Sequence, residues 1–136
     1  MKEIKFRAWD KEDNKMVYSD EVFPKSRYKF EFDCFSDYKF KLMKMVDRYN
    51  VVDDKGNETY QEVFLPIDAD IMQYTGMKDS NGKDIYEGDI VEYFKDELSQ
   101  IKLQRGGFVV ESETRFDTFF EIAGGIKVVG NIHEGI

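Results

Sequence analysis

Few residues in this chain of 136 have the types and spacing that catalysis requires. His133 is the only histidine and Cys34 the only cysteine, so a Ser-His-Asp or Cys-His centre would have to use His133. That histidine stands four residues from the end of the sequence, where chains commonly fray. A surface or strand-end histidine and a buried, inert thiol are the simpler interpretations. A metal site built from several histidines or several cysteines is excluded within one chain.

Carboxylates are abundant, with 28 Asp and Glu residues, and nothing sets one pair apart from the rest. The segments 10–14 and 79–82 resemble calcium loops superficially, but they lack the glycine and glutamate positions of an EF-hand. We interpret both as turns in which Asp and Asn side chains bond their own backbone. Phosphate-binding glycine loops are missing as well. The sequence therefore predicts no enzymatic activity and no cofactor, with a small hydrolase using two carboxylates as the remaining alternative.

Aromatic residues indicate recognition more than catalysis. Arg7 and Trp9 share one face of an extended segment, where an arginine beside the only tryptophan could form part of a protein interface. Tyr74, Tyr86 and Tyr93 could form an aromatic ligand surface. These five residues are the candidate interface. Packing of the aromatic rings in the core, with Arg7 paired to a carboxylate, is the simpler alternative.

The elements that would position these residues are mainly strands, because alternation dominates over helical spacing. Residues 4–18 predict a first hairpin around a polar loop, and residues 28–32 alternate as a half-buried strand requires. Residues 51–60 predict another hairpin around the loop 53–58.

The segment 35–49 carries two patterns at once. Its apolar residues recur at three and four positions, which favours a short helix capped by Asp33 or Ser36. Tyr38, Phe40 and Leu42 also alternate, which leaves a strand as the alternative.

Pro66 and its flanking carboxylates predict a boundary near residue 70, because proline cannot donate to a central sheet ladder. Beyond it the sequence predicts a hairpin over residues 71–86 and then five short strands, as in a small barrel. Those strands are predicted at 90–94, 100–104, 108–113, 118–122 and 127–132. We therefore expect a mainly β protein, with a β-rich region over residues 1–70 packing on a five-stranded barrel region over residues 71–136.

Charge is distributed unevenly along the chain. The formal net charge is −8, and residues 1–50 carry 12 basic and 10 acidic residues while residues 51–136 carry 8 and 18. An acidic second half disfavours general binding to nucleic acid backbones. Solubility explains this polarity, and head-to-tail contact between copies is the alternative. With no apolar run of membrane-spanning length and no secretion signal, we expect a cytoplasmic protein without a membrane partner.

Three segments together carry a family resemblance. They are Lys5-Phe6-Arg7-Ala8-Trp9-Asp10 with Lys15-Met16, then Met72 to Val91 around Asn81-Gly82-Lys83 and Tyr86-Glu87-Gly88-Asp89, and finally Val129-Gly130-Asn131-Ile132. In order and spacing the chain resembles the YopX family, small proteins known chiefly from bacteriophages and prophages of Gram-positive bacteria. It departs at His133, where an aromatic residue is usual. The resemblance implies a mostly β protein with an SH3-like barrel that forms a homo-oligomer, and it implies no known activity.

Three hypotheses for function follow. The first is a phage or prophage protein that is not an enzyme and serves as an oligomeric assembly or adaptor module in the host cytoplasm. The second is a nucleic-acid-associated module, by analogy with other SH3-like barrels. The third is the carboxylate hydrolase.

Overall fold

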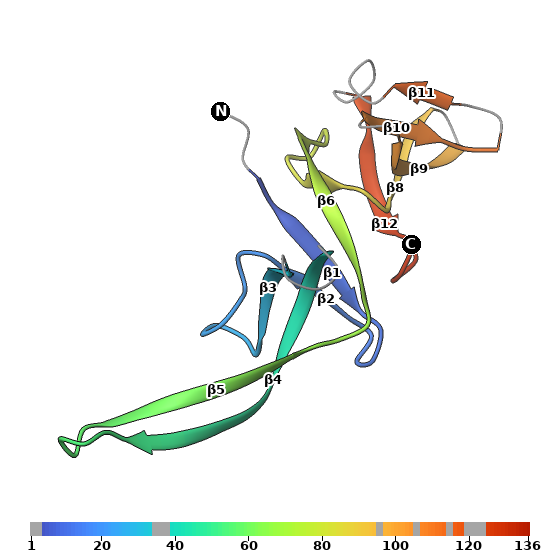
Figure 1. Ribbon diagram of the computed structural model, residues 1–136. Coiled ribbons are helices and arrows are strands. Elements are labelled where there is room, and N and C mark those ends of the chain that lie inside the picture. Colours follow the sequence, from blue (N-terminus) through green and yellow to red (C-terminus); the bar gives the residue numbers. More distant parts are fainter. Residues whose placement is uncertain (1–3, 34–38, 95–96, 105–106, 114–115, 119–124) are drawn as a thin grey trace. The chain divides into compact units, whose positions relative to one another are not determined.

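The structure is a computed structural model that describes residues 4–33, 39–94, 97–104, 107–113, 116–118 and 125–136 (Figure 1). Within these residues the secondary structure is antiparallel strand without an α-helix, so the prediction of a mainly β fold is confirmed. The strands are β1 (Phe6–Asp10), β2 (Lys15–Tyr18), β3 (Tyr28–Asp33), β4 (Lys39–Val52), β5 (Glu58–Pro66), β6 (Ala69–Lys78), β7 (Asp84–Tyr86), β8 (Asp89–Phe94), β9 (Glu97–Gln104), β10 (Gly107–Glu111), β11 (Phe116–Thr118) and β12 (Lys127–Asn131).

These strands form three sheets, and the chain divides into two compact units. The sheets have the orders β2-β1-β6-β7, β3-β4-β5 and β11-β10-β9-β8-β12. One unit comprises residues 7–71, and the other comprises residues 72–136 together with residues 1–6. We call them the N-terminal and C-terminal units.

The N-terminal unit is built from two hairpins whose apolar faces meet. In the first hairpin, Ala8 of β1 faces Val17 of β2. In the sheet of β3, β4 and β5, Phe30 faces Leu42, and Tyr28 lies on the same side of its strand. Ala8, Val17, Tyr28 and Leu42 form one buried cluster. The predicted alternation over residues 28–32 is thus explained, because every second side chain points into this core.

The helix predicted over residues 35–49 is wrong from residue 39 onward, where the chain forms β4. Asp33, one predicted cap, is the last residue of β3 and pairs with Lys39, while residues 34–38, with Ser36 and Cys34, lie outside the described residues. β4 has β3 on one side and β5 on the other. Pairing on both sides, together with the alternation of Phe40 and Leu42, overrides a helical spacing that local propensity alone favours.

The C-terminal unit contains the five-stranded sheet, which curls into a half-barrel. β8 to β11 follow one another as neighbours, and β12 returns beside β8. The predicted strands at 90–94, 100–104, 108–113 and 127–132 correspond to β8, β9, β10 and β12. The strand predicted at 118–122 overlaps β11 at Thr118 alone, and its remaining residues lie outside the described part of the chain. The core of this unit is a cluster of aliphatic side chains, namely Ile85, Val91, Ile101, Val110, Ile126 and Val128.

Gly130 explains part of the C-terminal segment noted in the sequence. A Cβ atom at this position would lie 2.1 Å from the carbonyl oxygen of Gly135. Asn131 and Gly135 form an isolated bridge, so the last residues fold back closely over β12. Only glycine allows this approach without movement of the backbone.

No helix in the described part of the chain is both long enough and apolar enough to cross a lipid bilayer.

Candidate functional site

The residues first considered for catalysis do not meet in the described structure. His133 lies in the turn after β12, where its backbone N–H donates to Asn131 Oδ1 at 3.0 Å. Cys34 lies outside the described residues. Among the described residues, no group of three His, Cys, Asp or Glu side chains is arranged to hold a metal ion.

Asp10 is fully buried at the end of β1 and holds the first hairpin loop against the sheet. Its carboxylate accepts the Tyr28 hydroxyl at 2.6 Å and the backbone N–H groups of Glu12 and Asp13 at 2.9 and 3.2 Å. The Lys44 ammonium lies 3.8 Å away and forms an ion pair with Asp13. Burial alone would raise the pKa of Asp10, but these hydrogen bonds and Lys44 lower it overall. The arrangement is structural, because all of these groups are occupied with one another.

Asp79 has the same role in the C-terminal unit. Its Oδ1 accepts the backbone N–H groups of Asn81 and Lys83 at 2.8 and 2.9 Å, and its Oδ2 accepts that of Val128 at 2.9 Å. Burial would raise the pKa of Asp79, and the three backbone hydrogen bonds lower it overall. The carboxylate therefore closes the β6–β7 turn and ties it to β12. The interpretation of both apparent calcium loops as turns is confirmed.

The five candidate interface residues are distributed as follows. Arg7 is 3% exposed in β1, and Trp9 is half-buried opposite Met16. Tyr74 and Tyr86 are 8% and 5% exposed and pack on each other with ring centroids 5.4 Å apart.

The Tyr93 backbone belongs to β8, and its side chain lies outside the described structure. Tyr74 and Tyr86 are in contact with each other, and their own chain covers both. A partner at any of the five residues stays a prediction.

A small hollow lies beside Tyr74 in the C-terminal unit. Its volume is about 170 Å³, and Lys5, Tyr74 and Phe108 are among the residues that line it. The Lys5 ammonium already forms an ion pair with Asp84 at 2.9 Å. Pockets that enclose drug-sized ligands are usually about 300 Å³ or larger, so this hollow is a weak candidate for a substrate site.

The sheet of β3, β4 and β5 offers a more distinctive surface. Cross-strand partners share a face, and the face with Tyr28 and Leu42 points into the core. The opposite side, which we call the outer face, carries both cations and apolar groups. Register places on it Lys29, Glu31, Lys39, Lys41, Met43, Met45 and Phe64.

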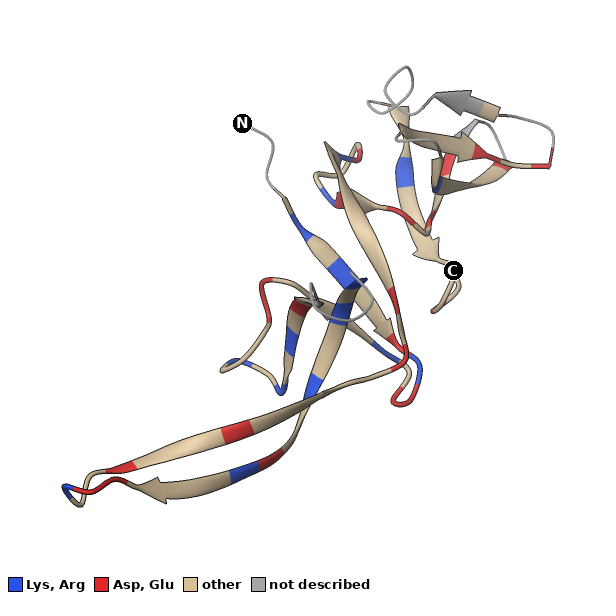
Figure 2. Ribbon diagram, viewed as in Figure 1, with Lys and Arg blue, Asp and Glu red and all other residues tan. Residues whose placement is uncertain are grey.

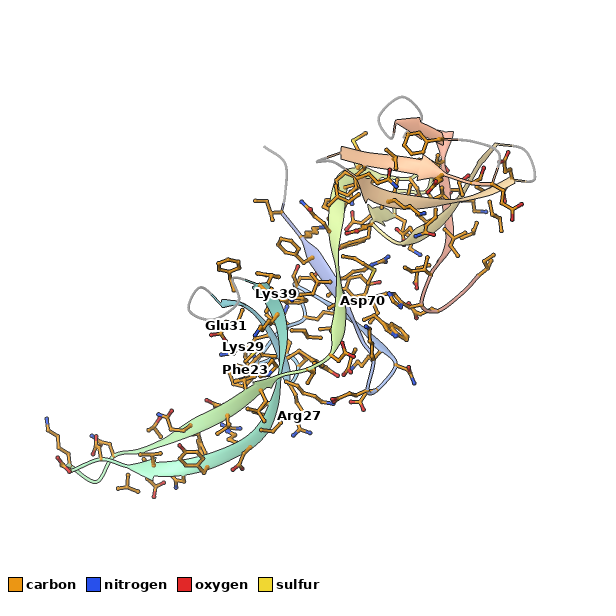
Figure 3. The ribbon with its side chains drawn as sticks, turned by 45° about the vertical axis from the view of Figure 1, so that its right-hand side comes forward. Phe23, Arg27, Lys29, Glu31, Lys39 and Asp70 are labelled. Carbon is orange, nitrogen blue, oxygen red and sulfur yellow. The ribbon has the colours of Figure 1, made fainter. Side chains whose placement is uncertain are left out.

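Aromatic rings and cations are in contact on this outer face. Phe23, from the loop before β3, packs edge-on against Phe64 with centroids 5.6 Å apart. The Lys29 ammonium lies 4.4 Å from the Phe64 ring centroid and 3.4 Å from Glu31 Oε2. Arg27 lies at the edge, where its guanidinium donates to the Met45 carbonyl at 3.2 Å. In Figure 3 the labelled side chains of Phe23, Arg27, Lys29 and Glu31 lie around β3 and the adjoining part of β4.

One end of the outer face borders a groove. Toward the start of β4, its pairing with β5 ends at Met43, which lies opposite Pro66. Beyond that pair, residues 39–42 and 66–69 line an open groove of about 340 Å³. Lys39 and Lys41 stand at this groove, which is therefore basic on the β4 side.

The same two strands continue in the other direction as an exposed hairpin. The register of β4 and β5 passes from Met45 opposite Phe64 to Asp47 opposite Val63, so Val46 is an extra, bulged residue. From there six residue pairs lead to the loop at 53–57 (Figure 1). Residues 46–61, which we call the arm, are all exposed except Val51, which is half-buried.

Apolar side chains occupy both faces of the arm. Tyr49 and Val51 share one face, and Val52 and Tyr60 share the other. Tyr49, Val52 and Tyr60 are 50%, 59% and 55% exposed. On the second face the Arg48 guanidinium lies 4.3 Å from the Tyr60 ring centroid and 3.6 Å from Glu62 Oε1. The arm therefore has side-chain contacts between its two strands but no core of its own.

Charge separates the arm from the rest of its sheet. Residues 25–44 include six basic and three acidic residues, whereas residues 46–62 include two basic and five acidic residues. Figure 2 shows the acidic residues along the arm and at its loop, and basic residues on β3 and on the first part of β4, which is the upper part in this view. The first segment carries a formal charge of +3 and the second a charge of −3.

Sequence reasoning missed the arm and the outer face. It predicted a hairpin only over residues 51–60, because the competing helical pattern over 35–49 hid the start of β4. A signal was present in the β-branched and aromatic residues on both sides of the loop, at Tyr49, Val51, Val52, Thr59 and Tyr60. The separation of charge within residues 25–62 was also visible, but the counts over whole halves of the chain averaged it away.

Comparisons with known proteins cover nearly the whole chain. The family model described as YopX protein matches residues 5–135. The crystal structure of protein EF1440 from Enterococcus faecalis is similar, with a TM-score of 0.61 and 25% sequence identity, over 98% of this chain and 96% of that one. No curated protein matches the chain.

Proposed function

The chain belongs to the YopX protein family, and from that premise we propose that it is a non-enzymatic protein that assembles with copies of itself as an assembly or adaptor module. The observation that supports the proposal most strongly is the arm, residues 46–61. The phage or prophage origin and the host cytoplasm that the family resemblance implies are part of the same proposal.

The arm supports self-assembly because a two-stranded ribbon is marginal by itself. An isolated hairpin gains too little burial in water to be firmly stable. β3 pairs with β4 only up to Lys44, so the arm has strand neighbours on neither outer edge among the described residues. Exposed edges with apolar side chains favour contact with another protein surface.

The absence of enzymatic activity is supported by the occupation of the buried carboxylates. Asp10, Asp79 and Asp89 are buried. Asp10 and Asp79 accept several hydrogen bonds from their own chain, and Asp89 accepts the backbone N–H of Tyr86 at 2.7 Å. A general acid or base has to reach a substrate proton, whereas these groups face turns.

Light scattering coupled to size exclusion tests self-assembly directly. At micromolar concentration we expect a mass that is a multiple of 16.1 kDa. Replacing Tyr49 and Tyr60 by serine should raise the dissociation constant about tenfold or more, because buried tyrosines often contribute over 1 kcal/mol each to an interface. The matched control replaces Leu98 and Leu103, which are also exposed but belong to β9, by serine. A wild-type protein that is strictly monomeric would contradict the proposal.

A second candidate function has one observation in its favour. The outer face combines Phe23 and Phe64 with Arg27, Lys29 and Lys41, and single-stranded nucleic acids bind to surfaces that combine stacking rings with cations. The net charge of −8 opposes it. A fluorescent single-stranded oligonucleotide titrated at about 20 mM salt should bind if this candidate is correct, since electrostatic affinity is greatest there. No binding under that condition would remove it.

A further inference from the structure

We propose that the arm of one copy docks on the outer face of a second copy, so that the acidic hairpin of each chain is covered by the basic and aromatic side of another. This inference rests on the proposed self-assembly and adds the two surfaces that meet.

The arm does not cover the outer face of its own chain in this structure. Both surfaces are built on β4 and β5, which continue from the sheet into the arm with only one bulge, at Val46. Folding the arm back over that face would require a sharp bend of both strands at this bulge. We therefore assign the ligand of the outer face to a different molecule.

The charges of the two surfaces are complementary. The segment 46–62 has a formal charge of −3, and the segment 25–44 that supplies β3 and the start of β4 has +3. Lys44 does not contribute to the outer face, because it points toward Asp10 and Asp13 on the core side. Arg27, Lys29, Lys39 and Lys41 are the cations that lie at the outer face and its edges. Placing two copies arm to arm would instead bring five acidic residues against five.

Both surfaces also carry aromatic side chains that can pack on one another. The arm offers Tyr49 or Tyr60, according to which of its faces is in contact. The outer face offers the Phe23 and Phe64 pair, with Lys29 already placed over a ring. Aromatic anchors surrounded by charge are what specific interfaces concentrate near their centres. The groove beside Lys39 and Lys41 gives the acidic loop of the arm a basic recess.

Symmetry limits the assemblies that this contact can make. If two chains exchange arms, both surfaces of each chain are covered and a closed dimer results. If each arm reaches the next chain in turn, the contact is heterologous, and it closes as a ring when the rotation between successive chains permits. In either case every arm finds one outer face, so the number of contacts equals the number of chains.

A charge-swap experiment tests the docking. The arm variant carries Asp54→Lys and Glu58→Lys at two exposed positions. The carboxylate that accepts the N–H groups of Lys55 and Asn57 and closes the loop is that of Asp53, which is left unchanged. The face variant carries Lys29→Glu and Lys41→Glu. In either variant alone, the arm and the outer face carry charges of the same sign. The dissociation constant of each variant should therefore rise about tenfold or more. Mixed, the basic arm meets the acidic face and the acidic arm meets the basic face, so association should return to the wild-type range.

The control variant carries Lys83→Glu and Lys127→Glu, which makes the same change in net charge as the face variant, but in the C-terminal unit. It should assemble like the wild type. Swapped variants that assemble like an oligomeric wild type, or that stay apart when mixed, overturn the docking while leaving self-assembly in place. A monomeric wild type overturns both.

A cross-linking measurement keeps the test valid if a swapped variant fails to fold. In a Cys34→Ser background, one population carries Asn57→Cys in the arm loop and the other carries Lys41→Cys on the outer face. Mixing under mild oxidation should give a disulfide-linked pair between the two populations. Replacing the second site by Lys83→Cys should give none. Equal yields from both sites, or no product from Lys41→Cys with an oligomeric protein, would overturn the docking.

Discussion

Asp10 and Asp79 show how this chain uses its acidic residues. Each carboxylate is buried, and each accepts hydrogen bonds from backbone N–H groups of a turn that would otherwise lack partners. The Asp79 carboxylate also reaches β12 through Val128. These two carboxylates are therefore held in place by hydrogen bonds within the fold. Their residue types and spacing in the sequence predicted turns and carried no information about a catalytic reaction.

Asp79→Ala should destabilise the protein by about 2–4 kcal/mol, because it leaves buried N–H groups without acceptors. The N–H of Val128 is the most affected, since it lies in the buried part of the C-terminal unit. Urea unfolding followed by circular dichroism measures the change. Asp54→Ala, an exposed loop carboxylate, is the control and should change stability by less than about 0.5 kcal/mol. Equal effects of the two substitutions would contradict the role given to Asp79.

Stability should fall in acid, and the direction follows from the same two carboxylates. The pKa values of Asp10 and Asp79 are both lowered from the reference value of 3.8. A lowered folded-state pKa adds stability above the unfolded-state pKa, and this contribution is lost as pH falls through the folded-state pKa.

Unfolding free energies measured from pH 7 down to pH 2 should therefore be nearly constant to about pH 5 and then decline. The Asp79→Asn variant should show a shallower decline than the wild type. A stability that rises between pH 5 and pH 3 would contradict the assignment.

At the scale of elements, the arm should be separable from the fold that carries it. Residues 48–62 can be replaced by Asn-Gly, which joins the paired residues Asp47 and Val63 by a two-residue hairpin turn. The core cluster around Leu42 lies outside the excised segment. We expect circular dichroism to show a folded β protein, and light scattering to show a monomer. An unfolded product would mean that the arm supports the core. An oligomer with the same number of subunits as the wild type would place the interface elsewhere.

Much of the element pattern could be predicted from the sequence, because local signals and tertiary pairing agree over most of it. Alternation with glycine-rich corners predicted β8, β9, β10 and β12 within a few residues. β4 is the exception. Its stretch from Lys39 to Tyr49 fits a helical stripe and a strand equally well, and only the presence of β3 and β5 on either side decides between them.

The candidate site was less predictable than the fold, and the reason is also physical. Phe23 and Phe64 are 41 positions apart in sequence, and only the register of three strands and a loop brings them together. Tyr74 and Tyr86 were predicted as interface residues because they stand beside a recognisable hairpin. In the structure the two rings pack on each other, which buries surface that a partner would need to contact. Strand periodicity marks side chains that share a face, but it does not say whether that face is covered.

At the scale of the whole molecule, two electrostatic effects act on self-assembly in opposite directions. Copies with a net charge of −8 repel one another over long distances, whereas the arm and the outer face attract at contact. The Debye length is about 8 Å at 0.15 M salt, about 30 Å at 0.01 M and about 3 Å at 1 M. Moderate salt therefore screens the repulsion between whole molecules and leaves close pairs largely intact.

The dissociation constant should consequently pass through a minimum as salt increases. We expect weaker assembly at 0.01 M, where the net charges repel, and at 1 M, where contacts such as those of Lys29 and Lys41 are screened. Sedimentation velocity across this range measures the constant. The face variant with Lys29→Glu and Lys41→Glu should lose the weakening at high salt, because it has no attraction left to screen. Assembly that strengthens steadily up to 1 M in the wild type would show that apolar contact acts alone, without the charges of the arm.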